Sequence, residues 1–118
     1  MVVARPNMPV KPPTLFVNKA EIRGDAHGFL HWGAAQAAVA RGVLESVAEG
    51  MISQGNVDGL VLIAAVWVDW AAENEEEVYA NNVEATRAAL ACAAEGRPRL
   101  AELRAIRTDP QNPFFRRA

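Results

Sequence analysis

Residues 59–70 read GLVLIAAVWVDW, and apolar side chains occupy both of the faces that alternate along this stretch. One face carries Leu60, Leu62, Ala64, Val66 and Val68, and the other carries Val61, Ile63, Ala65 and Trp67. A strand has this pattern when other parts of the fold cover it on both sides. The stretch therefore predicts the central strand of a small domain.

Composition and length favour one globular domain, to which we assign residues 1–118. The 14 acidic and 12 basic residues nearly balance, so the charge gives no indication of a nucleic-acid partner or a membrane surface. Cys92 is the single cysteine, which excludes an internal disulfide and fits a reducing compartment. No charged and then apolar leader opens the sequence, and the apolar run around Leu60 is too short to span a bilayer. We expect a cytoplasmic protein.

Upstream of the central strand, the sequence predicts a proline-rich loop followed by a second strand. Residues 5–13 hold four prolines, which predict a stiff, exposed loop. Residues 14–22 then alternate in a β-rich composition, with Leu15, Val17 and Lys19 on one face. Lys19 has two interpretations. It is either a strand-end lysine whose stem lies along apolar surface, or a cation beside the Asn18 amide that faces an anionic or electron-rich ligand.

Helices are predicted on either side of the central strand. Asp25 is a candidate N-cap for a helix from Ala26 to about Glu49, which Gly33 bends or interrupts. A second helix begins in the acidic block 73–77 and stops at Gly96, and a short third one follows from Leu100. The acidic block is either an interaction patch or, the interpretation we favour, a complement to the helix dipole.

Two histidines, His27 and His31, stand four residues apart and would share a face of the first helix, a spacing that metal ligands use. No glutamate follows His27 as in a metalloprotease motif, and no third ligand is apparent, so we expect no metal.

The predicted elements define an α+β fold in which a small sheet packs against two main helices. Two strands alone leave sheet edges unpaired and apolar surface uncovered. The sequence therefore predicts a partner, most simply a second copy of the chain.

Several motifs in one register resemble the formaldehyde-activating enzyme family, whose members read PNLPxKPxTLxxNK and then GPAQxGVA. The matching residues here are Pro6-Asn7-Met8-Pro9-Val10-Lys11-Pro12, Thr14-Leu15, Asn18-Lys19, Gly33-Ala34-Ala35-Gln36 and Val39-Ala40. Matching positions continue at Trp70, Glu84-Ala85-Thr86 and Pro113-Phe114. The resemblance implies a fold like the second domain of ribosomal protein S5 and rings of five subunits with a pterin bound between neighbours.

The resemblance also places three residues at pterin-contacting positions. Lys19 and Gln36 match the family's lysine and glutamine, whereas Glu21 stands where the family has threonine, so a carboxylate replaces a hydroxyl. The family's acid-base histidine lies upstream of anything that corresponds to Met1. No catalytic residue is therefore assigned, and the domain is expected to be N-terminally short.

The function that the resemblance implies belongs to one-carbon metabolism. It is the condensation of formaldehyde with the cosubstrate tetrahydromethanopterin, which gives methylene-tetrahydromethanopterin. This is a lyase-type reaction, expected to be weak or lost without the family's histidine, because a positioned proton donor contributes about 100 to 10,000-fold. Two alternatives stay open. The chain is either a non-catalytic module that binds pterin or formaldehyde, or a structural homologue that keeps only the homo-oligomer.

Overall fold

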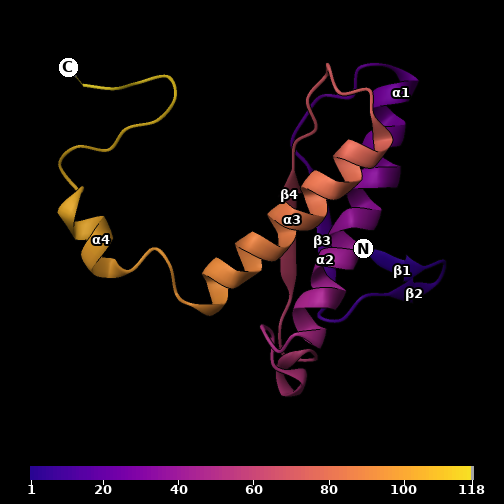
Figure 1. The fold of residues 1–118 in the computed structure, drawn as a ribbon, viewed down its shortest axis with the longest axis horizontal. Coiled ribbons are helices and arrows are strands. Elements are labelled where there is room, and N and C mark those ends of the chain that lie inside the picture. Colours follow the sequence, from indigo (N-terminus) through magenta and orange to yellow (C-terminus); the bar gives the residue numbers. More distant parts are fainter. Residues whose placement is uncertain (118) are drawn as a thin grey trace.

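The computed structural model describes residues 1–117 and has an α+β architecture built on two parallel strands. Strand β3 (Thr14–Asn18) pairs with β4 (Leu62–Val66), and Leu15 lies opposite Ile63 in the register. The connection between them is one long helical segment that consists of α1 (Gly24–Phe29), the π-helix η1 (Leu30–Ala35) and α2 (Gln36–Ala48). A short 3-10 turn, η2 (Gln54–Asn56), leads from it into β4. Figure 1 shows α2 and the long helix α3 (Glu75–Ala94) side by side over the strands.

The core lies between these helices and one face of the strand pair. Phe16, Leu62, Ala64 and Val66 from the strands pack with Val39 and Val43 of α2, Val78 of α3 and their apolar neighbours. The opposite face is exposed, with Val61 at 72% and Ile63 at 70% of their full accessibility. The alternation predicted for β4 is confirmed. The prediction that both faces are covered is wrong within this chain, because both helices lie on the same side of the sheet.

The N-terminal segment forms a small hairpin. Strands β1 (Val3–Arg5) and β2 (Met8–Pro9) pair antiparallel around Asn7, whose φ of 61° makes the turn. Val10 is buried against the core, and its N–H donates to the carbonyl of Val2 over 3.1 Å. The predicted exposed loop over residues 5–13 is therefore wrong in part. Prolines at the ends of such short strands are tolerated because their missing donors face away from the pairing.

The first helix begins earlier than the sequence indicates. Arg23 is its N-cap without any side-chain cap bond, and Gly24, with φ of 85°, makes the turn into the helix, so Asp25 lies in the first turn rather than at the cap. Gly33 falls inside η1, where the helix widens to π geometry without breaking. The expected interruption is thus a π turn in a continuous segment.

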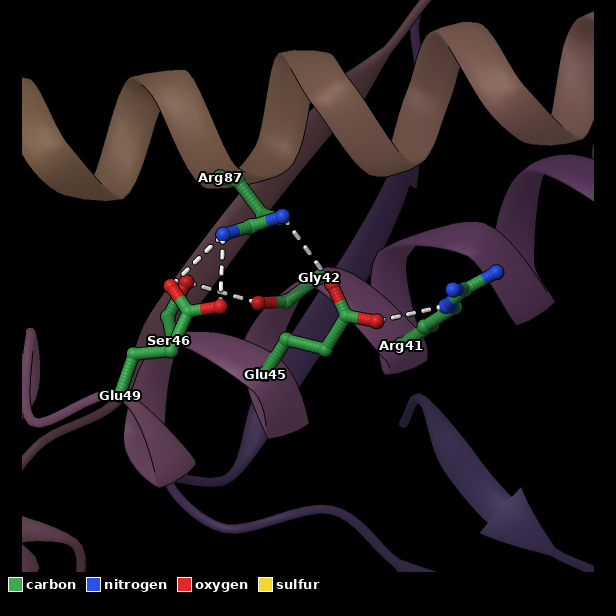
Figure 2. A network of polar contacts seen from close by, with 6 residues as sticks. All are labelled: Arg41, Gly42, Glu45, Ser46, Glu49 and Arg87. Carbon is green, nitrogen blue, oxygen red and sulfur yellow. Dashed lines mark hydrogen bonds and ion pairs between the residues drawn. The ribbon is translucent and has the colours of Figure 1, made fainter.

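Helix α3 begins inside the acidic block 73–77 and ends before Gly96, as the sequence predicts. The Asn74 side chain accepts a hydrogen bond from the N–H of Glu77 over 3.1 Å, and Gly96 (φ 66°) follows its last turn. The helix lies very close to α2 at Gly42, where a Cβ would stand 2.6 Å from the Cβ of Thr86. Figure 2 shows the polar contacts beside this crossing, in which Arg87 of α3 binds both carboxylate oxygens of Glu49, at 2.6 and 2.7 Å, and approaches Glu45 at 3.4 Å.

The C-terminal part extends away from this body, as Figure 1 shows. Helix α4 (Leu100–Ala105) confirms the predicted short helix, yet its apolar stripe is exposed. The molecule measures 47 × 40 × 19 Å, and its radius of gyration of 16.3 Å exceeds the value of about 13–14 Å expected of a compact chain of this length. Within residues 1–117, no helix is both long and apolar enough to cross a membrane.

Candidate functional site

Lys19 lies at the carboxyl end of the parallel strand pair. It directly follows β3, and its N–H donates to the carbonyl of Val66 in β4 over 2.8 Å, which continues the ladder by one residue. The side chain is exposed, and no hydrogen bond or ion pair within residues 1–117 engages its ammonium group. Asn18 does not pair with it, because Asn18 Oδ1 accepts from the N–H of Ala20 over 2.8 Å. The position leaves the cation available to a ligand, and it also suits a solvated strand-end lysine.

The backbone beyond Lys19 is held against the segment that follows β4. Trp70 Nε1–H donates to the carbonyl of Glu21 over 2.8 Å, and the Arg23 guanidinium lies 3.6 Å from the Trp70 ring centre. Trp67 meets Trp70 edge to face at 5.7 Å. These contacts fix the backbone of residues 19–23 while the Glu21 carboxylate stays exposed. The surface beside Lys19 is therefore ordered and rich in exposed indole.

Gln36 is the first residue of α2, immediately after the π-helix, and it is half-buried. Local π geometry is frequent at functional sites. Gln36 lies twelve residues after Gly24, where the helical segment begins. Within residues 1–117 no polar contact joins the side chains of Lys19, Glu21 and Gln36. The structure thus places Lys19 and Glu21 on one segment and Gln36 on another.

The two histidines do share a helix side, and their ring centres are 4.9 Å apart. His27 is fully engaged by the backbone: its Nδ1 accepts from the N–H of Arg23 at 3.1 Å, and its Nε2 lies 2.8 Å from the carbonyl of Val68. His31 is 0% exposed, and neither of its ring nitrogens has a hydrogen-bond partner among residues 1–117. Burial lowers the pKa of His31, and the neighbouring His27 lowers it further. The pair is thus part of the core in this chain, and no cluster of three or more metal-binding side chains forms among the described residues.

Two hollows lie along β4 and α3, and neither is lined by Lys19, Glu21 or Gln36. One, of about 650 Å³, opens at the start of α3 and includes Trp67, Asp69, Glu73 and Glu77. The other, of about 510 Å³, is an apolar groove between β4 and α3. Both were missed by sequence reasoning, because a hollow depends on how segments pack together and leaves no pattern in the sequence.

The fold and site together define a small α+β protein whose parallel strand pair is followed by an exposed lysine, near exposed tryptophans. The profile described as formaldehyde-activating enzyme (Fae) matches residues 1–115 of this chain. The chain belongs to this family.

Relatives of known description agree with the profile. Over 114 residues the chain is 40% identical to the 5,6,7,8-tetrahydromethanopterin hydro-lyase of Methanosarcina barkeri, an alignment that covers 97% of this chain and 64% of that protein. It is 40% identical over 96 residues to the bifunctional enzyme Fae/Hps of Methanococcoides burtonii, covering 81% of this chain and 24% of the relative. The corresponding enzyme of Archaeoglobus fulgidus is 36% identical over 98 residues, covering 83% and 25%. The chain thus spans somewhat less than two thirds of the first of these proteins and about a quarter of the others.

Proposed function

We propose that the chain takes part in the condensation of formaldehyde with tetrahydromethanopterin, which gives methylene-tetrahydromethanopterin and water. The observation that carries the proposal is the family match along residues 1–115, together with an unpaired Lys19 at the family's pterin-contacting position. The relative from Methanosarcina barkeri is named for the same pterin. A cytoplasmic setting belongs to the proposal and is supported by the lone, half-buried Cys92.

The reaction joins the formaldehyde carbon to a pterin nitrogen, which forms a carbinolamine, and then expels its hydroxyl as water as the second carbon–nitrogen bond closes. We assign binding and orientation to the residues of this chain. The Lys19 ammonium donates hydrogen bonds to an acceptor on the pterin, and the Gln36 amide supplies a neutral contact. The proton donor that drives the loss of water is not assigned to any of these residues.

We propose further that the working form is a homo-oligomer, for which the resemblance implies a ring of five. The exposed apolar face of β3 and β4 supports this part of the proposal, since surfaces of this kind in soluble proteins mark interaction sites. Lys19 and Gln36 make no direct polar contact within residues 1–117, and a pterin held between neighbouring copies would be reached by side chains of both.

The test follows methylene-tetrahydromethanopterin spectrophotometrically, with protein, formaldehyde and tetrahydromethanopterin, against the spontaneous reaction. We expect a saturable, protein-dependent rate. Replacing Lys19 with alanine removes a charge-assisted hydrogen bond of about 1.5–3 kcal/mol and lowers kcat/KM roughly 10 to 100-fold.

The matched control is Lys11→Ala, which removes the chain's other lysine from an exposed ion pair with Asp58 at 2.8 Å. This variant should keep the wild-type rate. A rate equal to the spontaneous background would refute the enzyme proposal. If the rate equals the background but the protein still binds pterin, the result would favour the non-catalytic module. If the protein does not bind pterin either, the result would favour the structural homologue.

A further inference from the structure

The C-terminal arm, residues 97–117, is an amphipathic segment that the rest of the chain leaves uncovered. Leu100 and Leu103 of α4 and Ile106, its C-cap, are spaced three apart and remain 47–62% exposed. Phe114, near the end of the arm, is 98% exposed. Figure 1 shows the whole arm directed away from the body. An apolar helix face held in water is unfavourable by the same burial energetics that hold a core together, so this face indicates a missing partner.

The arm is also strongly basic. It holds six arginines and two acids, Glu102 and Asp109. Apart from Arg97, which pairs with Glu95 at 2.7 Å, no arginine of the arm forms an ion pair within residues 1–117. A partner surface that suits the arm therefore offers both apolar side chains and carboxylates.

The hollow of about 650 Å³ at the start of α3, the α3 groove, offers both, together with asparagine side chains. Its wall combines Trp67, Ala72 and Val78 with the carboxylates of Asp69, Glu73 and Glu77. None of these three carboxylates forms an ion pair among the described residues. Trp67 also belongs to the exposed outer face of the sheet, so the groove continues the surface to which the homo-oligomer was attributed above.

Groove and arm lie at opposite ends of one helix. The groove opens at the N-terminal end of α3, and the arm leaves its C-terminal end after Gly96, about 30 Å away at the α-helical rise per residue. A contact between the arm of one copy and the groove of the next is heterologous, that is, head to tail. Contacts of this kind close into rings when the rotation between copies allows it.

We propose that the C-terminal arm of one copy docks in the α3 groove of a second copy, with its apolar stripe against Trp67 and Ala72 and its arginines on Glu73 and Glu77. The inference rests on the homo-oligomer proposed above and does not depend on pterin or on the condensation reaction. It names the segment that links the copies and the surface that receives it.

The experiment exchanges the charges of the two surfaces and measures association by sedimentation velocity over a range of protein concentrations, without pterin. An arm variant carries Arg104→Glu and Arg107→Glu, and a groove variant carries Glu73→Arg and Glu77→Arg. Each variant alone places like charges together, and we expect its dissociation constant to rise at least about tenfold. An equimolar mixture pairs each reversed surface with an opposite charge and should associate more tightly than either variant alone.

The mixture also separates contacts between copies from contacts within one chain. If the arm folds back onto the groove of its own chain, mixing the variants would not strengthen association, because each chain still has like charges on its arm and its groove. Glu84→Arg is the control, since it reverses an exposed acid on α3 outside the groove and should associate like the wild type. Circular dichroism of every variant checks that the helices form.

Two results would overturn the proposal. Reversed variants that fold and associate as tightly as the wild type would show that other surfaces hold the copies together, which leaves the homo-oligomer and the condensation proposal standing. A mixture no tighter than its components would show that the arm does not reach a second copy. The condensation rate, measured separately, reports on the proposed function alone.

Discussion

His31 lies in the core without any hydrogen-bond partner among residues 1–117, in contact with aromatic rings. Phe16 meets it edge to face at 6.4 Å, and His27 does so at 4.9 Å. A buried polar atom without a partner costs about 1–3 kcal/mol. The neutral imidazole is the form that this environment tolerates, because burial lowers the pKa of His31 below its ordinary 6.5.

A pH dependence of stability follows from His31. Its folded-state pKa is lowered, so the unfolded chain binds the proton more readily, and the stability present above about pH 6.5 is lost as pH falls toward the folded pKa. His31→Met replaces the ring with an adaptable apolar side chain and should raise the free energy of unfolding by about 1–2 kcal/mol at pH 7.5. The gain should be larger at pH 5.5. Urea unfolding at both pH values measures it, and an unchanged pH slope in the variant would contradict the assignment.

Glu21 sets the charge of the surface beside Lys19. Its backbone is held by Trp70, so a substitution there changes the side chain and leaves the position of the chain fixed. Glu21→Thr restores the hydroxyl of the family pattern and removes an anion two residues from Lys19, the lysine proposed to contact pterin. We expect a several-fold lower KM for the pterin, of the order that one neutral hydrogen bond of about 1 kcal/mol supplies. Glu95→Thr, an exposed acid after α3, is the control, and equal KM values for both variants would separate Glu21 from the site.

At the scale of elements, the crossing of α2 and α3 is the closest packing in the molecule that involves a glycine. A methyl group at Gly42 would stand 2.6 Å from Thr86 Cβ and 3.3 Å from the carbonyl oxygen of Val83, so the two helices would have to separate. Gly42→Ala should lower the free energy of unfolding by about 1–3 kcal/mol, despite the better helix propensity of alanine.

Gly28→Ala is the matched control for this crossing. Its new Cβ would make an ordinary contact of 3.5 Å with Ile22, so the substitution should be neutral or stabilise by up to about 1 kcal/mol. The measurement is the thermal unfolding midpoint of each variant, compared with that of the wild type. Equal midpoints would mean that the helices can part at Gly42 without cost.

How far the sequence predicts these elements depends on whether the signal is local. Helix α3 was predictable because the acidic block 73–77 and Gly96 mark its two ends within its own sequence. The pairing of Met8 with Arg5 in the N-terminal hairpin was not predictable. The many prolines there favour a loop more strongly than two or three alternating residues favour a strand. The uncovered face of β4 was not predictable either. A strand that another copy covers carries the same apolar pattern as one covered by its own chain.

The candidate site follows the same division. Lys19 could be placed at a strand end from the alternation that precedes it, and the family pattern added Gln36 and Glu21. The clamp of Trp70 on the carbonyl of Glu21 joins residues 49 apart and involves a backbone acceptor, which leaves no mark in the side-chain sequence. The isolation of His31 was missed for a similar reason, because the spacing of two histidines indicates a shared face and says nothing of its burial.

At the scale of the whole molecule, the strand pair has apolar side chains on both faces and helices on only one. Leu15, Ile63 and Trp67 are 44%, 70% and 51% exposed, and all three lie on the uncovered face. We expect this face to be buried between copies. A charge placed at its centre would then be left unpaired in an apolar interface, which is strongly unfavourable.

Ile63→Lys tests this arrangement directly. The lysine is tolerated in a separate chain, because the side chain it replaces is already exposed, so the variant should keep its circular dichroism and its melting midpoint at low protein concentration. Its association constant should fall at least about tenfold, a change equivalent to about 1.4 kcal/mol. Phe29→Lys is the control, since Phe29 is equally exposed, at 73%, but lies on α1 away from the sheet face. If both variants associate like the wild type, the apolar face of β3 and β4 is not the surface that joins the copies, and the arm and groove would have to hold the assembly alone.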